Sequence, residues 1–322
     1  MRQVLPDLAR VVLPFCQVPG VIIDSLLSVF LVIALGWALR QTLLPNEASW
    51  QGFETISYYV LVPVLVAKTL LHAKLGTVPF GKLAFALVGT IAILSALLVA
   101  FRPLIERLFR TTPPGFTSIF QGVLRWNAFI ALAVSANLFG NDGVTLAAVA
   151  IAALIPLLNV LSVLILRKHG TGGGSLVRGL ATNPFILGTL AGLALNVLAP
   201  PVPRSLGMAL DIVGNCALGS GLMLVGAGLN IRDLQRPSPA LLFGILLRLI
   251  VTPLIGYALA HAVGLSGNGL VIAIVCLGVP TASASYLLAR KMGGDAPLMA
   301  AITTGQTLLS MLTLPLLLAL LT

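Results

Sequence analysis

The sequence predicts an all-α membrane protein that crosses the bilayer many times, and three observations lead to this prediction. The 322 residues are 58% hydrophobic and only 9% charged, whereas soluble domains carry roughly 25% charged residues. The mean hydropathy is +1.06, so lipid must be the solvent for much of the surface. The apolar residues also fall in long runs that are separated by short polar connections.

Ten stretches of the chain are long and apolar enough to cross a membrane, which takes about 20 residues. In chain order they are residues 21–41, 52–72, 80–102, 117–138, 143–166, 176–198, 205–229, 239–262, 267–290 and 296–321. Residues 1–20 contain Pro6, Pro14 and Pro19. We interpret them as an N-terminal lead-in, broken by these prolines, and not as a cleaved signal, because no small-residue cleavage site precedes the first span.

A polar break at residues 167–175 divides the ten spans into five and five. It contains a run of glycine and serine that is typical of a flexible linker. Residues 21–166 and 176–322 are therefore predicted to be two five-helix repeats. Gly140 in the first repeat aligns with Gly293 in the second, at an offset of 153 residues (293 − 140). A repeat of five spans starts from the opposite side of the membrane the second time, and such inverted repeats are typical of secondary transporters.

The basic residues predict the orientation of the chain. The net charge is +10, but Lys and Arg are spread along the connections and do not form the basic face of a nucleic-acid-binding protein. One side of the ten-span topology carries eleven of them and the other side carries six. The richer side is predicted to be cytoplasmic. Both termini then lie on the non-cytoplasmic side of the cytoplasmic (inner) membrane.

The fourth and ninth spans differ from the others because each contains a residue that interrupts a membrane helix. Arg125, about eight residues into the fourth span, lies roughly 12 Å deep at 1.5 Å per residue, and a charge there must face a cavity or a partner. Pro280 in the ninth span lacks an amide hydrogen and kinks or breaks the helix. The offset of 153 places Asn127 of the fourth span on Pro280.

Asn127 and Pro280 predict a binding site for an anion. Asn is a strong N-cap and Pro favours the first position of a helix, so each is predicted to begin the second half of a broken span. Two half-helix N-termini would then offer amide hydrogens and positive dipole ends near the membrane midplane. The alternative is a pair of ordinary kinked helices, with Asn127 bonded to a neighbouring helix.

Further polar residues lie at depth in the fifth, ninth and tenth spans: Asn159, Thr281, Ser283, Ser285 and Gln306. Each one alone is typical of a hydrogen bond between membrane helices. Together they would line one cavity with the two predicted helix breaks. We therefore include Asn159, Thr281, Ser283 and Gln306 among the candidate binding residues.

Four charged residues have more than one interpretation. Arg248 in the eighth span either neutralises unpaired carbonyls of the broken helices or binds substrate. Asp211, early in the seventh span, is a candidate for proton coupling or marks a hydrated helix end. Asp142 and Asp295 each lie within two residues after a glycine and precede an apolar run, so they are predicted to cap the fifth and tenth spans.

Other functional classes lack the residues that they need. The chain has no glycine-rich phosphate loop, which argues against ATP-driven pumping. Its three histidines, His72, His169 and His261, have neither metal-ligand nor Ser/His/Asp spacing, and its three cysteines show no disulfide or metal pattern. We therefore expect no enzymatic activity, no cofactor and no metal.

The chain resembles a bacterial member of the auxin efflux carrier family. The matching stretches are residues 125–133 with 138–140, 156–162, 183–185 with Gly192 and Asn196, and 279–282 with 288–289 and 294–295. They follow the order of the family and cover nearly the whole chain. Two departures, Trp126 in place of proline before the crossover asparagine and the lack of a long central hydrophilic loop, argue against auxin as the substrate.

The resemblance implies a crossover fold, which is also seen in the antiporter NhaA and in bile acid transporters. Spans 1, 2, 6 and 7 would form a scaffold, and spans 3–5 and 8–10 a transport domain in which spans 4 and 9 cross. Asn127 would contact a substrate carboxylate and Pro280 would be the crossover proline. Family substrates are small organic anions such as malonate. Sodium-coupled relatives use acidic residues near the crossover, and spans 4, 5, 9 and 10 have none.

The sequence therefore predicts a secondary transporter that carries malonate or another small carboxylate by alternating access. Arg125 would supply charge at the site, and the transport would be linked to protons. A second hypothesis is a membrane receptor or assembly subunit that binds a carboxylate at the same crossover without moving it. Besides lipid, the expected partners are the carboxylate, protons and a second copy of the chain, bound through spans 1, 2, 6 and 7.

Overall fold

The computed structural model describes residues 5–71, 80–171, 184–198, 203–235, 237–282 and 284–322, and all regular structure within these ranges is helical. Seven helices in this part of the chain are long and apolar enough to cross a membrane. The predicted class, an all-α protein with several membrane-spanning helices, is thereby confirmed.

The difference between seven helices and the ten predicted spans comes from three places in the chain. The fourth and fifth predicted spans fall in one continuous apolar stretch, Pro113–His169. The sixth is represented by the short helix Leu187–Leu198, because residues 176–183 lie outside the described ranges. The ninth is shortened to Gly267–Gly278 by an interruption. The polar linker is likewise described only up to Thr171.

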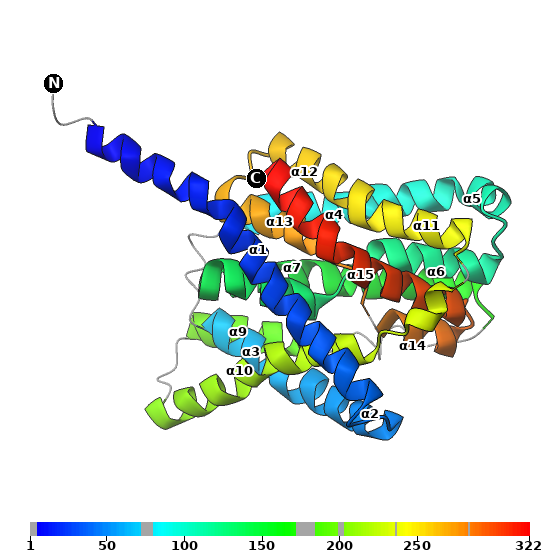
Figure 1. The fold of residues 1–322 in the computed structure, drawn as a ribbon, viewed down its shortest axis with the longest axis horizontal. Helices are drawn as coiled ribbons and strands as arrows, with labels where there is room; N and C mark the ends of the chain where they lie inside the picture. The colour runs from blue at the N-terminus through cyan, green and yellow to red at the C-terminus, as the bar shows by residue number, and fades with distance from the viewer. Residues whose placement is uncertain (1–4, 72–79, 172–183, 199–202, 236, 283) are drawn as a thin grey trace.

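One group of helices forms the lower part of the molecule in Figure 1. Its members pack against one another; they are α1 (Leu5–Gln41), α2 (Glu47–Ile56), the π-helix η1 (Ser57–Leu61), α3 (Val62–Leu71), α9 (Pro184–Leu198) and α10 (Arg204–Ala227). Helix α1 begins at Leu5, and its N-terminal part extends beyond the other helices (Figure 1). Residues 5–20 therefore form a helix and not a broken lead-in. Pro6 lies in the first turn, where its missing amide hydrogen is not needed.

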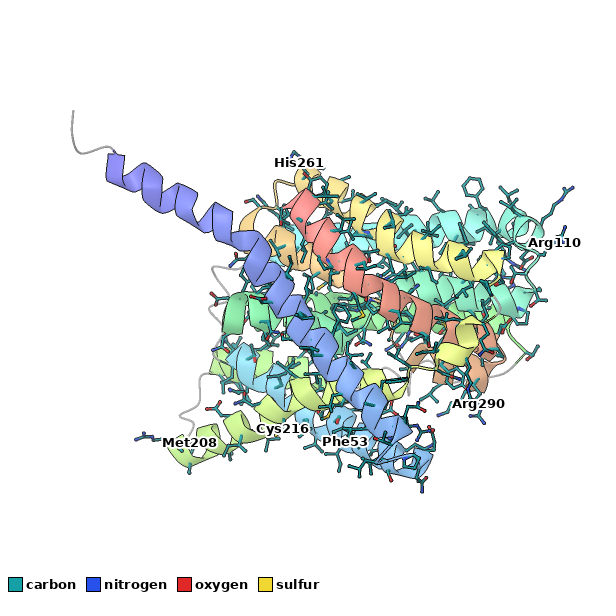
Figure 2. All side chains as sticks on the ribbon, viewed as in Figure 1. Phe53, Arg110, Met208, Cys216, His261 and Arg290 are labelled. Carbon is teal, nitrogen blue, oxygen red and sulfur yellow. The ribbon has the colours of Figure 1, made fainter. Side chains whose placement is uncertain are left out.

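The second group forms the upper and right-hand parts of Figure 1. It consists of α4 (Phe80–Ala100), α5 (Arg102–Leu108), α6 (Pro113–Leu124), α7 (Ala128–His169), the short η3 (Ile231–Leu234), α11 (Pro239–Leu246), the π-helix η4 (Leu247–Val251), α12 (Thr252–Ala262), α13 (Gly267–Gly278), α14 (Ala284–Met292) and α15 (Ala296–Leu321). Helices α7 and α15 also contact α1, so they lie between the two groups. Arg110 and Arg290 lie at one end of the bundle, far from Met208 (Figure 2).

Two predicted helix caps have different outcomes. Asp295 caps α15, because its Oδ1 accepts a hydrogen bond from the backbone N of Leu298 at 2.9 Å. Asp142 does not cap a helix. Helix α7 continues through a kink at Gly140, which has φ 56° and ψ −136°, and only glycine adopts such a backbone readily. Two helices meet at this kink, and the second is helical directly after Gly140, so Asp142 lies within its first turn and not at the N-cap position.

Glycines set the closest approach in the lower group. A Cβ atom added to Gly226 of α10 would lie 1.8 Å from the carbonyl oxygen of Ile33 in α1, and one added to Gly36 of α1 would lie 2.1 Å from the carbonyl oxygen of Met223. Small residues allow membrane helices to approach backbone to backbone. The crossing of α1 and α10 therefore depends on these two glycines.

Gly226→Ala is expected to destabilise the protein, because the added methyl group must push α1 and α10 apart. Overpacking of this kind costs about 1–3 kcal/mol. The measurement is the temperature at which half of the purified protein loses its monodisperse peak in detergent. Gly219→Ala on the same helix is the matched control, since a Cβ there meets nothing within 4 Å. Equal losses of stability in both variants would contradict this account of the crossing.

Candidate functional site

Two helix interruptions meet inside the upper group. Helix α6 ends at Leu124 and α7 begins at Ala128, with extended backbone between them. Helix α13 ends at Gly278, and α14 begins at Ala284. The backbone N of Asn127 donates a hydrogen bond to the carbonyl oxygen of Pro280 at 2.8 Å, which joins the two interruptions. Both lie where the sequence predicts them.

Asn127 is the N-cap of α7, as predicted. Its Oδ1 accepts hydrogen bonds from the backbone N atoms of Phe129 and Ile130 at 3.1 and 3.2 Å. The residue is only 3% exposed. With Oδ1 occupied, the Nδ2 amide has two N–H groups to donate, and it has no partner among the described residues. A donor at a helix N-terminus suits a carboxylate oxygen.

Pro280 has a different position from the one predicted. It does not begin a helix, because α14 starts four residues later at Ala284. Pro280 lies in the link between α13 and α14, where its carbonyl accepts the bond from Asn127. Its main effect is on the preceding helix, because a proline nitrogen cannot donate to the carbonyl four residues before it.

Arg248 of η4 holds the two interruptions together. It is completely buried. Its Nε donates to the carbonyl oxygen of Val279 at 2.9 Å, Nη1 to that of Val123 at 3.2 Å and Nη2 to that of Cys276 at 3.0 Å. Of the two predicted roles, the contacts therefore favour neutralisation of helix carbonyls over direct contact with a substrate.

Helix geometry explains why two of these carbonyls are available. In an α-helix each carbonyl accepts from the N–H four residues later. The carbonyl of Cys276 would need the N–H of Pro280, which does not exist. The carbonyl of Val123 would need the N–H of Asn127, which donates to Pro280 instead. Arg248 satisfies both carbonyls, which would otherwise be buried without a donor.

Gln306 of α15 supports the same crossing from another side. Its Oε1 accepts from the backbone N of Thr281 at 2.8 Å, and its Nε2 donates to the carbonyl oxygens of Gly122 and Gly244 at 2.9 and 3.0 Å. The side chain is fully buried, and its acceptor and both of its donors are used. Gln306, predicted as a binding residue, therefore positions the crossover.

Thr281 is buried in this link as well. Its Oγ1 donates to the carbonyl oxygen of Gln121 at 3.4 Å and lies 3.5 Å from Oγ of Ser285. The backbone and side chain of Thr281 thus both contribute to the crossover. Ser283, also predicted as a binding residue, lies outside the described residues.

Arg125 lies in the first interruption, next to Asn127. Its Nη1 donates to Oδ1 of Asn159 at 3.2 Å and to Oγ of Ser162 at 3.5 Å, both on α7. Tyr58 of η1 is close enough for an electrostatic interaction with Arg125, so the lower group of helices also borders this position. The sequence carries no signal for Tyr58, although π-helical turns are frequent at functional sites.

Unpaired polar atoms accumulate in the first interruption and in the turn just before it. The buried Nε2 and Oε1 of Gln121, Nε of Arg125 and Nε1 of Trp126 have no hydrogen-bond partner within the part of the chain that the structure describes. Buried polar groups are nearly always paired in folded proteins. Together with Nδ2 of Asn127, residues 121–127 carry four side chains with unpaired N–H donors. A segment so rich in donors suits an anionic ligand.

Asp211 lies apart from the crossover. It is on α10 and forms an ion pair with Lys68 of α3. The Asp211 side chain is 52% exposed. Lys68 borders a cavity of about 340 Å³ between α3, α9 and α10, which is lined mainly by apolar residues. The structure thus brings Arg125, Asn127, Asn159, Thr281 and Gln306 together with Arg248 and Pro280, and places Asp211 in the other group of helices.

Comparison with known proteins bears on the class of this protein. The model of the family described as "Membrane transport protein" matches residues 173–318. A relative from Methanothermobacter thermautotrophicus, described as an "Uncharacterized transporter", is 22% identical over 297 residues, which cover 91% of this chain and 96% of the relative. The helical fold and these matches define the class of the protein as a membrane transporter. They also confirm its predicted resemblance to the auxin efflux carrier family.

Proposed function

We propose that the protein is a secondary transporter of small organic anions, such as malonate or another carboxylate. The observation that carries this proposal is the crossing of two interrupted helices, at which Asn127 is bonded to Pro280 and presents an unpaired amide. Broken helices in transporters point their half-helix N-termini at anionic groups of the substrate. The donors in residues 121–127 supply the same chemistry.

We further propose that the chain forms ten spans in two inverted repeats. Three backbone features recur at the predicted offset of 153 residues. Gly140 and Gly293 both have positive φ, at 56° and 70°. Asn127 and Pro280 form the two interruptions, and the carbonyls of Val123 and Cys276, which bind Arg248, are also 153 residues apart (276 − 123). Arg248 thus contacts equivalent positions in both repeats.

Alternating access follows from the two groups of helices. The upper group contains both interrupted helices, joined by Arg248 and Gln306, and we propose that it moves as a unit against the lower group. Helices α7 and α15 face the lower group and would slide along it. In this proposal the lower group is the scaffold and mediates dimer formation. The protein lies in the inner membrane with both termini on the non-cytoplasmic side.

The test is the flux of labelled malonate and related carboxylates into proteoliposomes that contain the purified protein, with and without an imposed pH gradient. Saturable flux that responds to the gradient would support a proton-linked carrier. Flux that does not depend on the pH gradient would support facilitated transport of the same anion. Binding of a carboxylate without any flux would instead favour the receptor hypothesis.

Arg125→Met is expected to raise the concentration needed for half-maximal flux by about 10- to 100-fold, because a charge-assisted hydrogen bond contributes about 1.5–3 kcal/mol. Arg125→Lys keeps the charge and should raise the half-saturating concentration by a smaller factor. Arg110→Met is the control, since Arg110 is an exposed residue at one end of the bundle (Figure 2). If all three variants have the same half-saturation, Arg125 does not contact the anion.

A further inference from the structure

Arg248 has a positive charge that no acidic side chain of the described residues balances. Its three hydrogen bonds go to backbone carbonyls, two of them in the last turns of α6 and α13. The guanidinium is fully buried, and a buried charge without compensation is costly. The negative ends of the two half-helices provide the compensation, because the C-terminus of a helix carries about −0.5 of a charge.

The charges of the crossover can be added up from its four half-helix ends. The C-termini of α6 and α13 contribute about −1 together, and the N-termini of α7 and α14 contribute about +1 together. Without Arg248 these ends cancel. Arg248 adds about +1 to this sum, and Arg125 in the first interruption adds a second positive charge, so the crossover is positive and suits an anion.

Carbonyl oxygens at helix interruptions are also the groups that coordinate Na⁺ in transporters with broken helices. Here Arg248 uses three of them. We propose that Arg248 is a built-in counter-cation: it does at the crossover what a bound Na⁺ does elsewhere, so that the carrier binds its anion without Na⁺. This inference rests on the proposed function and names a second source of positive charge, besides Arg125, for the same site. Arg248 is a positioning residue that acts through the carbonyls and does not contact the anion.

The first test compares substitutions of similar size that differ in charge. Binding of labelled malonate and related carboxylates is measured on purified protein, in buffers of Na⁺ or of N-methylglucamine. The unaltered protein should bind the carboxylate with the same affinity in both buffers, within about two-fold. Arg248→Met should bind at least ten times more weakly, and Arg248→Lys should fall between them. The exposed Arg232, changed to Met, is the control and should behave as the unaltered protein does.

The second test separates charge from hydrogen bonding. Arg248→Ala leaves a space near the three carbonyls. Guanidinium and urea are both planar and similar in size, and both can donate hydrogen bonds to these carbonyls from that space. Guanidinium is expected to restore anion binding several-fold and urea is not. Na⁺ should also improve binding to this variant, although it leaves the unaltered protein unchanged.

Several results would overturn the inference. One is anion binding by the unaltered protein that depends on Na⁺, and another is equal binding by Arg248→Lys and Arg248→Met. The inference also fails if urea restores binding to Arg248→Ala as well as guanidinium does, or if guanidinium does not restore binding to a monodisperse Arg248→Ala variant. If Arg248→Ala does not fold, the inference is tested by comparing anion binding by Arg248→Lys with that by Arg248→Met. The proposed function fails in a different way, namely by the absence of both anion binding and flux in the unaltered protein.

Discussion

Asn127→Asp is expected to abolish carboxylate transport while the protein keeps its stability. Aspartate is as good an N-cap as asparagine, so its carboxylate continues to accept from the backbone N atoms of Phe129 and Ile130. The substitution removes both N–H donors of the amide and places a negative charge beside the anion. We expect uptake to fall by at least 100-fold, which corresponds to about 2.7 kcal/mol.

The measurement is initial uptake into proteoliposomes together with thermal stability in detergent. Asn141→Asp is the matched control, because Asn141 is an exposed residue of the same helix α7, and its uptake should stay normal. Asn127→Ala should lose both functions of the side chain, since the loss of a cap alone costs about 0.5–2 kcal/mol. Normal uptake by Asn127→Asp would show that the amide of Asn127 does not contact the substrate.

The predictable part of the site consists of features that a single residue imposes on its own backbone. Asn127 was recognisable as a cap because its side chain bonds to amides two and three residues later, and Asp295 was recognisable for the same reason. Pro280 showed that the ninth span is interrupted, although the new helix begins only at Ala284. A proline removes a bond from the preceding turn but does not determine where the next helix starts.

The parts that the sequence did not predict depend on contacts between distant elements. Gln306 joins Gly122, Gly244 and Thr281, and no local pattern distinguishes such a residue from one that binds a ligand. The ion pair of Asp211 with Lys68 is likewise set by the packing of α10 on α3. Asp211 stays a predicted site of proton coupling. Its partner became visible only in three dimensions.

Gln306→Leu is expected to destabilise the protein by about 2–4 kcal/mol. Leucine has a similar volume but leaves the N–H of Thr281 and the carbonyl of Gly122 buried without partners, and each such group costs about 1–3 kcal/mol. Loss of the bond to the carbonyl of Gly244 costs less free energy, because this carbonyl also accepts from the backbone N of Leu247. The measurement is the temperature of half-maximal loss of the monodisperse protein in detergent.

Gln121→Leu is the matched control, and we expect the opposite effect on stability. Gln121 is also completely buried, but neither polar atom of its side chain has a partner among the residues that the structure describes, so leucine removes two unpaired groups and leaves none behind. Stability should stay constant or rise, while carboxylate uptake should fall if Gln121 donates to the anion. A gain in stability with a loss of function is the usual sign that a binding site carries unsatisfied groups for its ligand. Equal destabilisation by both substitutions would mean that Gln121 has a structural partner and that residues 121–127 are not a donor site.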